Sequence, residues 1–175
     1  MVAAEPADRL LLQGFVDVPR LNDIDGDGFP ELVVGSLRPD LIGTISAGGS
    51  GSVDAQLNVF KNTFAADGGR FARPVAMVEQ IGLTGDILKS RVRDRVLATF
   101  FQDVNGDGIR DFWQRTQMDH VLVRAVSKEE TRYALGDVLW EMHIDPDALT
   151  MLVDESSHAA VIAIEEEQVI YAEFR

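Results

Sequence analysis

Two short segments of the sequence carry side-chain oxygens at alternate positions, the arrangement that binds a hard cation. Residues 23–31 (loop 1) read Asp-Ile-Asp-Gly-Asp-Gly-Phe-Pro-Glu, and residues 103–111 (loop 2) read Asp-Val-Asn-Gly-Asp-Gly-Ile-Arg-Asp. Ca²⁺ takes six to eight oxygen ligands at about 2.3–2.6 Å, from carboxylates, amides, backbone carbonyls and water. Because alternate side chains of a tightly turning loop converge on one point, each segment predicts a calcium site.

The predicted ligands are the side chains at positions one, three, five and nine of each loop and the backbone carbonyl at position seven. They are Asp23, Asp25, Asp27, Phe29 and Glu31 in loop 1, and Asp103, Asn105, Asp107, Ile109 and Asp111 in loop 2. The glycines at positions four and six allow the positive φ angles that such a curl needs. Without a cation the clustered carboxylates would repel one another. We therefore expect two Ca²⁺ ions.

Ordinary turns and EF-hand loops share part of this pattern. Asp, Asn and Gly favour turns without any metal, but two copies that agree at every ligand position favour a metal. An EF-hand needs a bidentate Glu at its twelfth position and flanking helices. The twelfth positions here are Val34 and Gln114, and the flanks have strand character.

The elements that must position the loops are β-strands. Loop 1 is preceded by the apolar residues 10–18 and followed by 32–34, and loop 2 lies between residues 96–101 and 112–113. Further apolar or β-branched runs predict strands. These runs cover residues 58–60, 71–78, 120–126, 139–144, 149–153, 158–164 and 169–174.

The strands group into about three repeats of four within one domain, residues 1–175. We place the repeats at residues 9–80, 91–135 and 137–175, and the first two carry the loops. The segment of the third repeat that corresponds to the loops is residues 143–149. It has Leu149 where a ligand is needed, so no metal is predicted there. Residues 87–97 and 127–142 have partial helical spacing, and Ser127 begins a capping-box pattern, so one or two short helical insertions are also compatible with the sequence.

The loop residues resemble the FG-GAP or VCBS repeats of integrin α-subunit propellers and of many bacterial surface proteins. The resemblance rests on residues 23–35 and 103–113, with weaker support from 58–62 and 69–71. It implies an all-β fold of propeller-like, four-stranded antiparallel blades, in which the calcium loop joins two strands. Glu31 replaces the usual Asp, which lengthens that ligand arm. Since a closed propeller has four to eight blades, about three cannot close a ring alone.

Composition limits the classes of function. The net charge is −13, from 16 Lys and Arg against 29 Asp and Glu, which disfavours nucleic-acid binding through a basic face. Seven of the 29 acidic residues lie in the two loops, so much of the excess negative charge is concentrated there. No run approaches the ~20 apolar residues of a membrane span. The chain has no cysteine, and residues 1–8 lack the features of a signal peptide.

Three further groups of residues carry weaker signals of a site. His120, His143 and His158 lie far apart in the sequence, and we expect ordinary strand or loop histidines rather than a zinc site. Residues 165–167, three glutamates, suit a charged turn. Arg91, Arg93 and Arg95 would share one strand face, where a solvated face is expected before a docking site for an acidic partner or glycan.

These observations favour a calcium-stabilised, non-catalytic binding or scaffold module that contacts a protein or glycan. Millimolar calcium is extracellular, so we expect the cell surface, the periplasm or the exterior, with a leader absent from this chain. Another chain that completes the ring is a possible partner. The alternative is an accessory or fragment domain of a secreted enzyme that cleaves polysaccharides or phosphoesters, although the sequence offers no nucleophile or acid–base pair.

Overall fold

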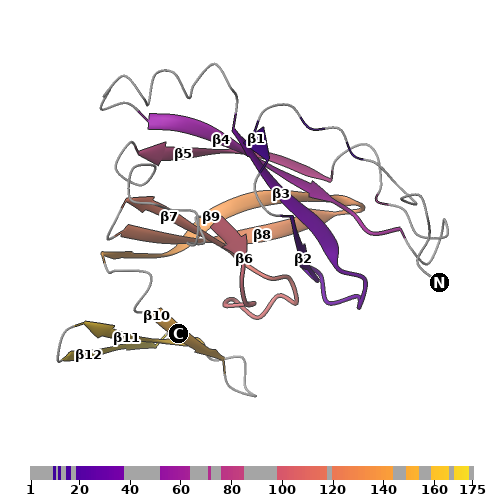
Figure 1. The fold of residues 1–175 in the computed structure, drawn as a ribbon. Coiled ribbons are helices and arrows are strands. Elements are labelled where there is room, and N and C mark those ends of the chain that lie inside the picture. Colours follow the sequence, from indigo (N-terminus) through magenta and orange to yellow (C-terminus); the bar gives the residue numbers. More distant parts are fainter. Residues whose placement is uncertain are drawn as a thin grey trace, which may run out of the picture. The chain divides into compact units, whose positions relative to one another are not determined.

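The computed structural model shows an all-β chain, as the sequence predicts (Figure 1). It describes residues 10, 12, 15–16, 19–37, 52–63, 71, 76–84, 98–117, 120–143, 149–153, 159–165 and 168–173. Within these ranges every regular element is a β-strand, and the strand pairs with a defined register are antiparallel. The described residues contain no helix of the length and apolar character that a membrane span needs.

The first sheet contains loop 1 and has the strand order β1-β3-β4-β5, with β2 also paired to β3. Its strands are β1 (Phe15–Val16), β2 (Arg20–Asn22), β3 (Glu31–Leu37), β4 (Ser52–Phe60) and β5 (Met77–Thr84). Strands β1 and β2 pair with successive parts of the same edge of β3, Phe15 with Leu37 and Arg20 with Val33. Together they act as one interrupted strand, so the sheet is a meander in sequence order.

The second sheet contains loop 2 and has the order β6-β7-β8-β9. Its strands are β6 (Ala98–Phe100), β7 (Phe112–Gln117), β8 (His120–Glu129) and β9 (Arg132–His143). A third sheet contains β10 (Leu149–Val153), β11 (Ala159–Glu165) and β12 (Gln168–Glu173). Strand β9 extends beyond residue 135, where we placed the end of the second repeat, and the repeat boundaries stay a prediction.

The helical alternative for residues 127–142 is wrong. This segment is the β8–β9 hairpin, which turns at Glu130 with a φ of 54°. Side chains of a strand alternate between its two faces, and Val121 and Val123 are both buried on one face of β8. The burial of this face outweighs an isolated capping-box signal. Gly136 also weakens a helix and here lies beside Ala125 of β8. The other helical candidate, residues 87–97, lies outside the described residues.

The chain divides into two compact units, each with its own apolar core. Unit 1 comprises residues 1–82 with 129–133, and unit 2 comprises residues 83–128 with 134–175. The loops contribute directly to these cores, because Ile24 of loop 1 and Val104 of loop 2 are buried. Val104 packs with Val123, against which Trp113, Leu139 and Trp140 also lie. Each loop is therefore anchored by its second residue.

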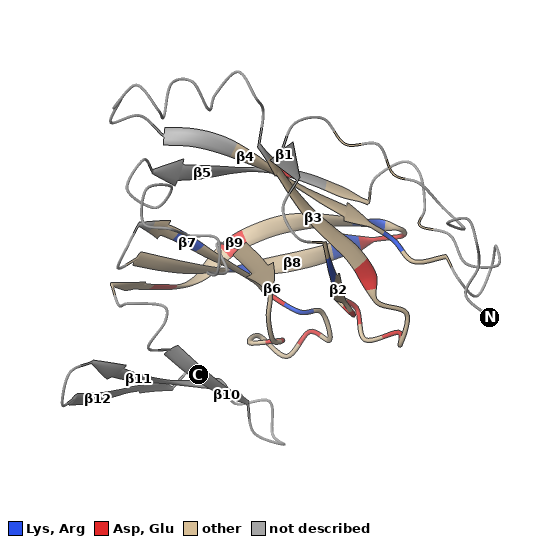
Figure 2. Cartoon of the chain, viewed as in Figure 1, with Lys and Arg blue, Asp and Glu red and all other residues tan. Residues whose placement is uncertain are grey.

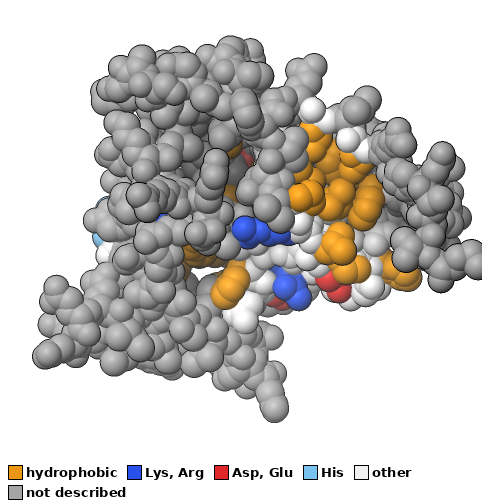
Figure 3. Space-filling view, viewed as in Figure 1, with side chains coloured by type: hydrophobic (Ala, Val, Ile, Leu, Met, Phe, Trp, Pro, Cys, Tyr) orange, Lys and Arg blue, Asp and Glu red, His pale blue; other side chains and the backbone are white. Residues whose placement is uncertain are grey.

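A few large apolar side chains remain at the surface. Hydrophobic side chains of described residues are visible on the face drawn in Figure 3. The most exposed are Leu21, Phe29, Phe101 and Val138. Single exposed apolar residues are normal in folded proteins and do not by themselves mark an interface.

Candidate functional site

Both acidic loops connect neighbouring antiparallel strands, as the strand-loop-strand pattern predicts. Loop 1 joins β2 to β3, and loop 2 joins β6 to β7. Figure 2 shows acidic residues along both connections. In loop 1 the carboxylate oxygens of Asp23, Asp25 and Asp27 lie within 4.8 Å of one another. The structure thus brings together three of the predicted ligands.

The two loops share one set of internal hydrogen bonds. The backbone N–H at position six, Gly28 or Gly108, donates to the carboxylate at position one, at 3.2 and 2.7 Å. The N–H at position seven, Phe29 or Ile109, donates to the carboxylate at position five, at 2.8 Å in both loops. These bonds hold the two carboxylates against the backbone of the loop. The carbonyl ligands predicted at Phe29 and Ile109 stay a prediction.

The glycines have the conformation that the sequence predicts. Gly26 and Gly28 have φ angles of 67° and 82°, and Gly106 and Gly108 have 76° and 87°. Only glycine adopts this left-handed region without a steric cost from Cβ.

Substitution of Gly108 by alanine is expected to lower the free energy of unfolding by about 1–2 kcal/mol through backbone strain. A Cβ at this position meets no atom within 4 Å, so overpacking does not contribute. Gly108→Asn is the matched variant and should cost less, because asparagine tolerates positive φ. Chemical denaturation measures both, and equal losses in the two variants would contradict the strain argument.

The acid at position nine is buried in both loops. Glu31 is 0% exposed and Asp111 is 1% exposed. One oxygen of each accepts the backbone N–H of position two, from Ile24 at 2.9 Å and from Val104 at 2.7 Å. This bond ties the end of the loop to its beginning and leaves the second oxygen for another partner.

In loop 1 that partner is an internal cation, the ammonium group of Lys61. Its Nζ lies 2.7 Å from Asp25, 2.7 Å from Asp27 and 2.8 Å from Glu31. Burial by itself lowers the pKa of Lys61, but the hydrogen bonds with these three carboxylates outweigh burial and raise it. The lysine is therefore fully charged and neutralises part of the cluster.

Tyr133 completes the group around Lys61 and belongs to the same unit. Its hydroxyl donates to Asp25 at 2.8 Å, and Lys61 Nζ lies 3.4 Å from the same hydroxyl oxygen. Burial raises the pKa of Tyr133, and the bond to Asp25 and the nearby acidic charges add to that rise. The tyrosine therefore stays protonated and acts as a hydrogen-bond donor to the carboxylate.

Loop 2 lacks both charges of this arrangement. Extending the β3–β4 and β7–β8 registers by one residue places Ala125 where the first sheet has Lys61. Asn105 likewise occupies the position of Asp25. The two differences cancel in charge. Loop 1 has both the extra carboxylate and the lysine, and loop 2 has neither.

In loop 2 the electrostatic effect of the missing lysine falls on Asp111. Its Oδ1 is buried and has no hydrogen-bond partner in the described part of the chain. Burial raises the pKa of Asp111 to about 6, and the charges of Asp107 and Asp103 add to the rise against the opposing backbone hydrogen bonds. A buried, unpartnered carboxylate oxygen that faces other acids is the ligand that a divalent cation would satisfy.

The acids of loop 1 converge as a hard cation needs, but Lys61 already contacts them. Loop 2 has Ala125 in place of that lysine and keeps a buried, unpartnered oxygen on Asp111 in the described part of the chain. Sequence reasoning did not identify Lys61 and Tyr133 as part of this cluster. The signal for Lys61 was the strand 58–60 that follows loop 1, since its antiparallel pairing with β3 places the next residue opposite Glu31. Tyr133 had no comparable signal, because it is remote in sequence.

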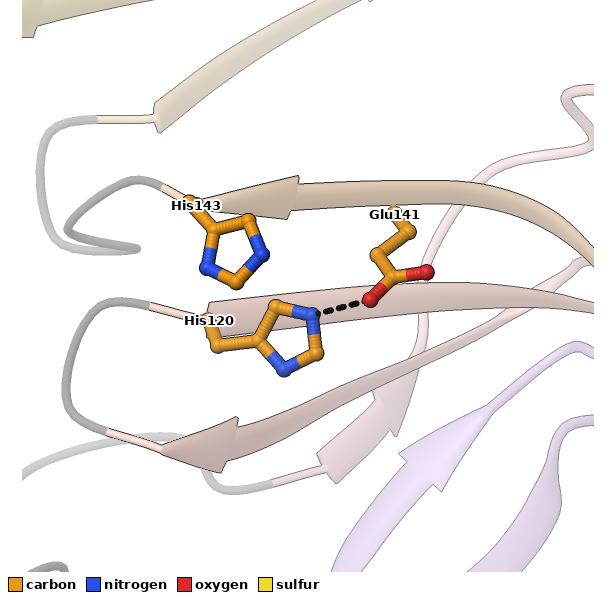
Figure 4. A group of neighbouring side chains, drawn as sticks. All are labelled: His120, Glu141 and His143. Atoms are coloured by element: carbon orange, nitrogen blue, oxygen red, sulfur yellow. Dashed lines mark hydrogen bonds and ion pairs between the residues drawn. The ribbon is translucent and has the colours of Figure 1, made fainter.

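A second cluster joins residues that are far apart in the sequence. His120 and His143 stack with ring centroids 4.5 Å apart, and His120 Nε2 lies 2.8 Å from Glu141 (Figure 4). His120 and His143 are strand histidines, as the sequence predicts, and nothing in the sequence indicated that they lie together. His158, the arginines at 91, 93 and 95, residues 166–167 and most of residues 143–149 lie outside the described residues.

Searches of protein-family models, curated proteins and solved structures find no match to this chain.

Proposed function

We propose that the chain is a calcium-stabilised, non-catalytic binding or scaffold module built from FG-GAP-like repeats. The observation that carries the proposal is the buried Oδ1 of Asp111, which has no partner among the described residues, in a loop whose backbone N–H groups hold the Asp103 and Asp107 carboxylates. A bound Ca²⁺ would supply the missing partner and relieve the repulsion among these acids. The metal would thus act on stability and loop geometry rather than on a substrate.

The two loops are proposed to bind calcium with unequal affinity. Loop 2 offers Asp103, Asn105, Asp107 and Asp111 with no competing lysine among the described residues. In loop 1 calcium must displace the Lys61 ammonium from three carboxylates. Loop 2 is therefore the tighter site and loop 1 the weaker one.

The location and partner follow from the calcium level that such sites need. A site with a Kd of ~10⁻⁴ M in ~10⁻³ M calcium contributes roughly 1.4 kcal/mol of stability. Calcium at that level places the module at the cell surface, in the periplasm or outside the cell. The partner we propose is a protein or glycan, or a second chain that completes the ring of blades.

Equilibrium dialysis with calcium tests the metal sites directly. We expect two sites of different affinity in the wild-type chain, with the tighter one lost in Asp107→Asn and the weaker one lost in Asp27→Asn. Asp137→Asn, at an exposed position of β9, removes the same charge outside the loops and is the control. Two equal sites, or loss of the tighter site in Asp27→Asn, would refute the assignment.

Thermal unfolding with excess calcium and with chelator tests the structural role. Calcium is expected to raise the midpoint of the wild-type chain, and Asp107→Asn should remove most of that rise. An unchanged midpoint together with no calcium retained in dialysis would contradict the structural-calcium proposal.

A further inference from the structure

A group of metal-ligating side chains lies on the second sheet, apart from the two acidic loops in sequence and in composition. His120 is the first residue of β8, and Glu141 and His143 lie near the end of the neighbouring β9 (Figure 4). Residues two apart on a strand project to the same face. The hairpin therefore presents a carboxylate and an imidazole from β9 to an imidazole from β8.

The potential ligand atoms already converge. One nitrogen from each histidine and one oxygen of Glu141 lie within 4.8 Å of one another. Ligands bound to Zn²⁺ at about 2.0–2.2 Å in a tetrahedron lie about 3.3 Å apart, so binding needs a contraction of the group and a rotation of the His143 ring out of its stack on His120. The Glu141 side chain is 56% exposed and His143 is also exposed, which leaves both free to adjust.

Strand β7, on the other side of β8 from β9, holds His120 in place. The Thr116 hydroxyl lies at hydrogen-bond distance from His120 Nδ1, and Thr116 occupies the irregularity in the β7–β8 register between Arg115 and Gln117. β-Bulges of this kind redirect a side chain away from the regular alternation. The His120 side chain is only 11% exposed, so its ring is the fixed member of the group.

Thr116 also makes His120 compatible with a metal. Without a metal, His120 Nε2–H donates to the Glu141 carboxylate, and Nδ1 lies at hydrogen-bond distance from the Thr116 hydroxyl. A metal on Nε2 requires the ring proton on Nδ1, where it would donate to the same hydroxyl. A hydroxyl group serves as donor or acceptor, and ligating histidines usually have such a partner on their second nitrogen.

We propose that His120, Glu141 and His143 form a binding site for a divalent transition metal ion of the zinc class. Two imidazoles and one carboxylate suit Zn²⁺ and its neighbours, whereas calcium prefers oxygen alone. Three protein ligands leave a fourth position for water. The site is thus distinct in chemistry from the calcium loops, and Thr116 acts on it as a positioning residue.

Isothermal titration of the untagged chain with Zn²⁺, in excess calcium to fill the acidic loops, tests the proposal. We expect one Zn²⁺ per chain, with at least a tenfold loss of affinity in His143→Ala and in Glu141→Gln. Both positions are exposed, so the fold should persist, which circular dichroism checks. Asp137→Asn on the same strand and His158→Asn, the remaining histidine, are the controls and should bind as the wild-type chain does.

Thr116→Val is expected to lower Zn²⁺ affinity about 10- to 100-fold, as loss of such a partner usually does, and Thr116→Ser should restore it. Absence of Zn²⁺ binding would overturn the proposal and leave a stacked histidine pair with a hydrogen bond from His120 to Glu141. Binding that survives both His143→Ala and Glu141→Gln would overturn it as well. An equal loss in His158→Asn would refute the three-residue assignment.

Discussion

Replacement of Lys61 by methionine is expected to lower the free energy of unfolding by about 3–5 kcal/mol in calcium-free buffer. The Lys61 ammonium contacts three carboxylates, and two of them, on Asp25 and Glu31, have side chains that are 3% and 0% exposed. Removing the cation leaves these charges buried beside one another without a counter-charge. Methionine keeps most of the length of the apolar stem, so lost packing contributes little. Urea unfolding in chelator measures the loss.

A double variant separates charge from packing in this experiment. Asp25→Asn combined with Lys61→Met removes one acid with the lysine and reproduces the uncharged pair Asn105 and Ala125 of loop 2. We expect the double variant to recover a substantial part of the stability lost in the single one. Saturating calcium should also restore Lys61→Met, because the metal can take the place of the ammonium group. If both conditions leave the loss unchanged, the electrostatic explanation fails.

The second large effect is expected at Asp111, and its sign depends on calcium. In chelator, Asp111→Asn should raise the free energy of unfolding by about 1–3 kcal/mol, because it removes a buried charge that has an unpartnered oxygen and faces Asp107 and Asp103. The asparagine oxygen can still accept the Val104 N–H. In saturating calcium the order reverses, because the wild-type chain gains about 4.1 kcal/mol at a thousandfold excess over Kd and the variant loses that gain.

Urea unfolding of both chains, with calcium and with chelator, measures this reversal. Asp137→Asn removes an exposed acid from β9 and should show no such dependence on calcium. A variant that is less stable than the wild-type chain by the same amount in both buffers would show that Asp111 acts through its hydrogen bond to Val104 alone. The calcium-ligand role of Asp111 would then have to be abandoned.

Local chemistry made the loops predictable. Their acids, their glycines and the flanking apolar runs lie within a few residues of one another, so the sequence alone predicted a strand, a tight curl and a second strand. The positive φ of Gly28 and Gly108 and the pairing of β6 with β7 agree with that prediction. Short-range spacing also predicted β10 with the bounds that the structure has, residues 149–153.

The partners of the loops could not be predicted in the same way. Lys61 meets Glu31 across 30 residues, and Tyr133 meets Asp25 across 108. The histidine group depends on a hairpin at Glu130, in a segment whose spacing was compatible with a helix. Had residues 127–142 been assigned to strands, the turn would have placed His120 beside Glu141 and His143.

The sequence by itself determined that this chain is built from β-strands and that two of its connections gather acids. The tertiary structure decided which of those acids already have a counter-charge. Lys61 lies among the acids of loop 1, whereas Ala125 occupies the corresponding position beside Asp111 of loop 2. The reason is that cross-strand register, rather than local sequence, selects which side chain lies opposite the ninth residue of each loop.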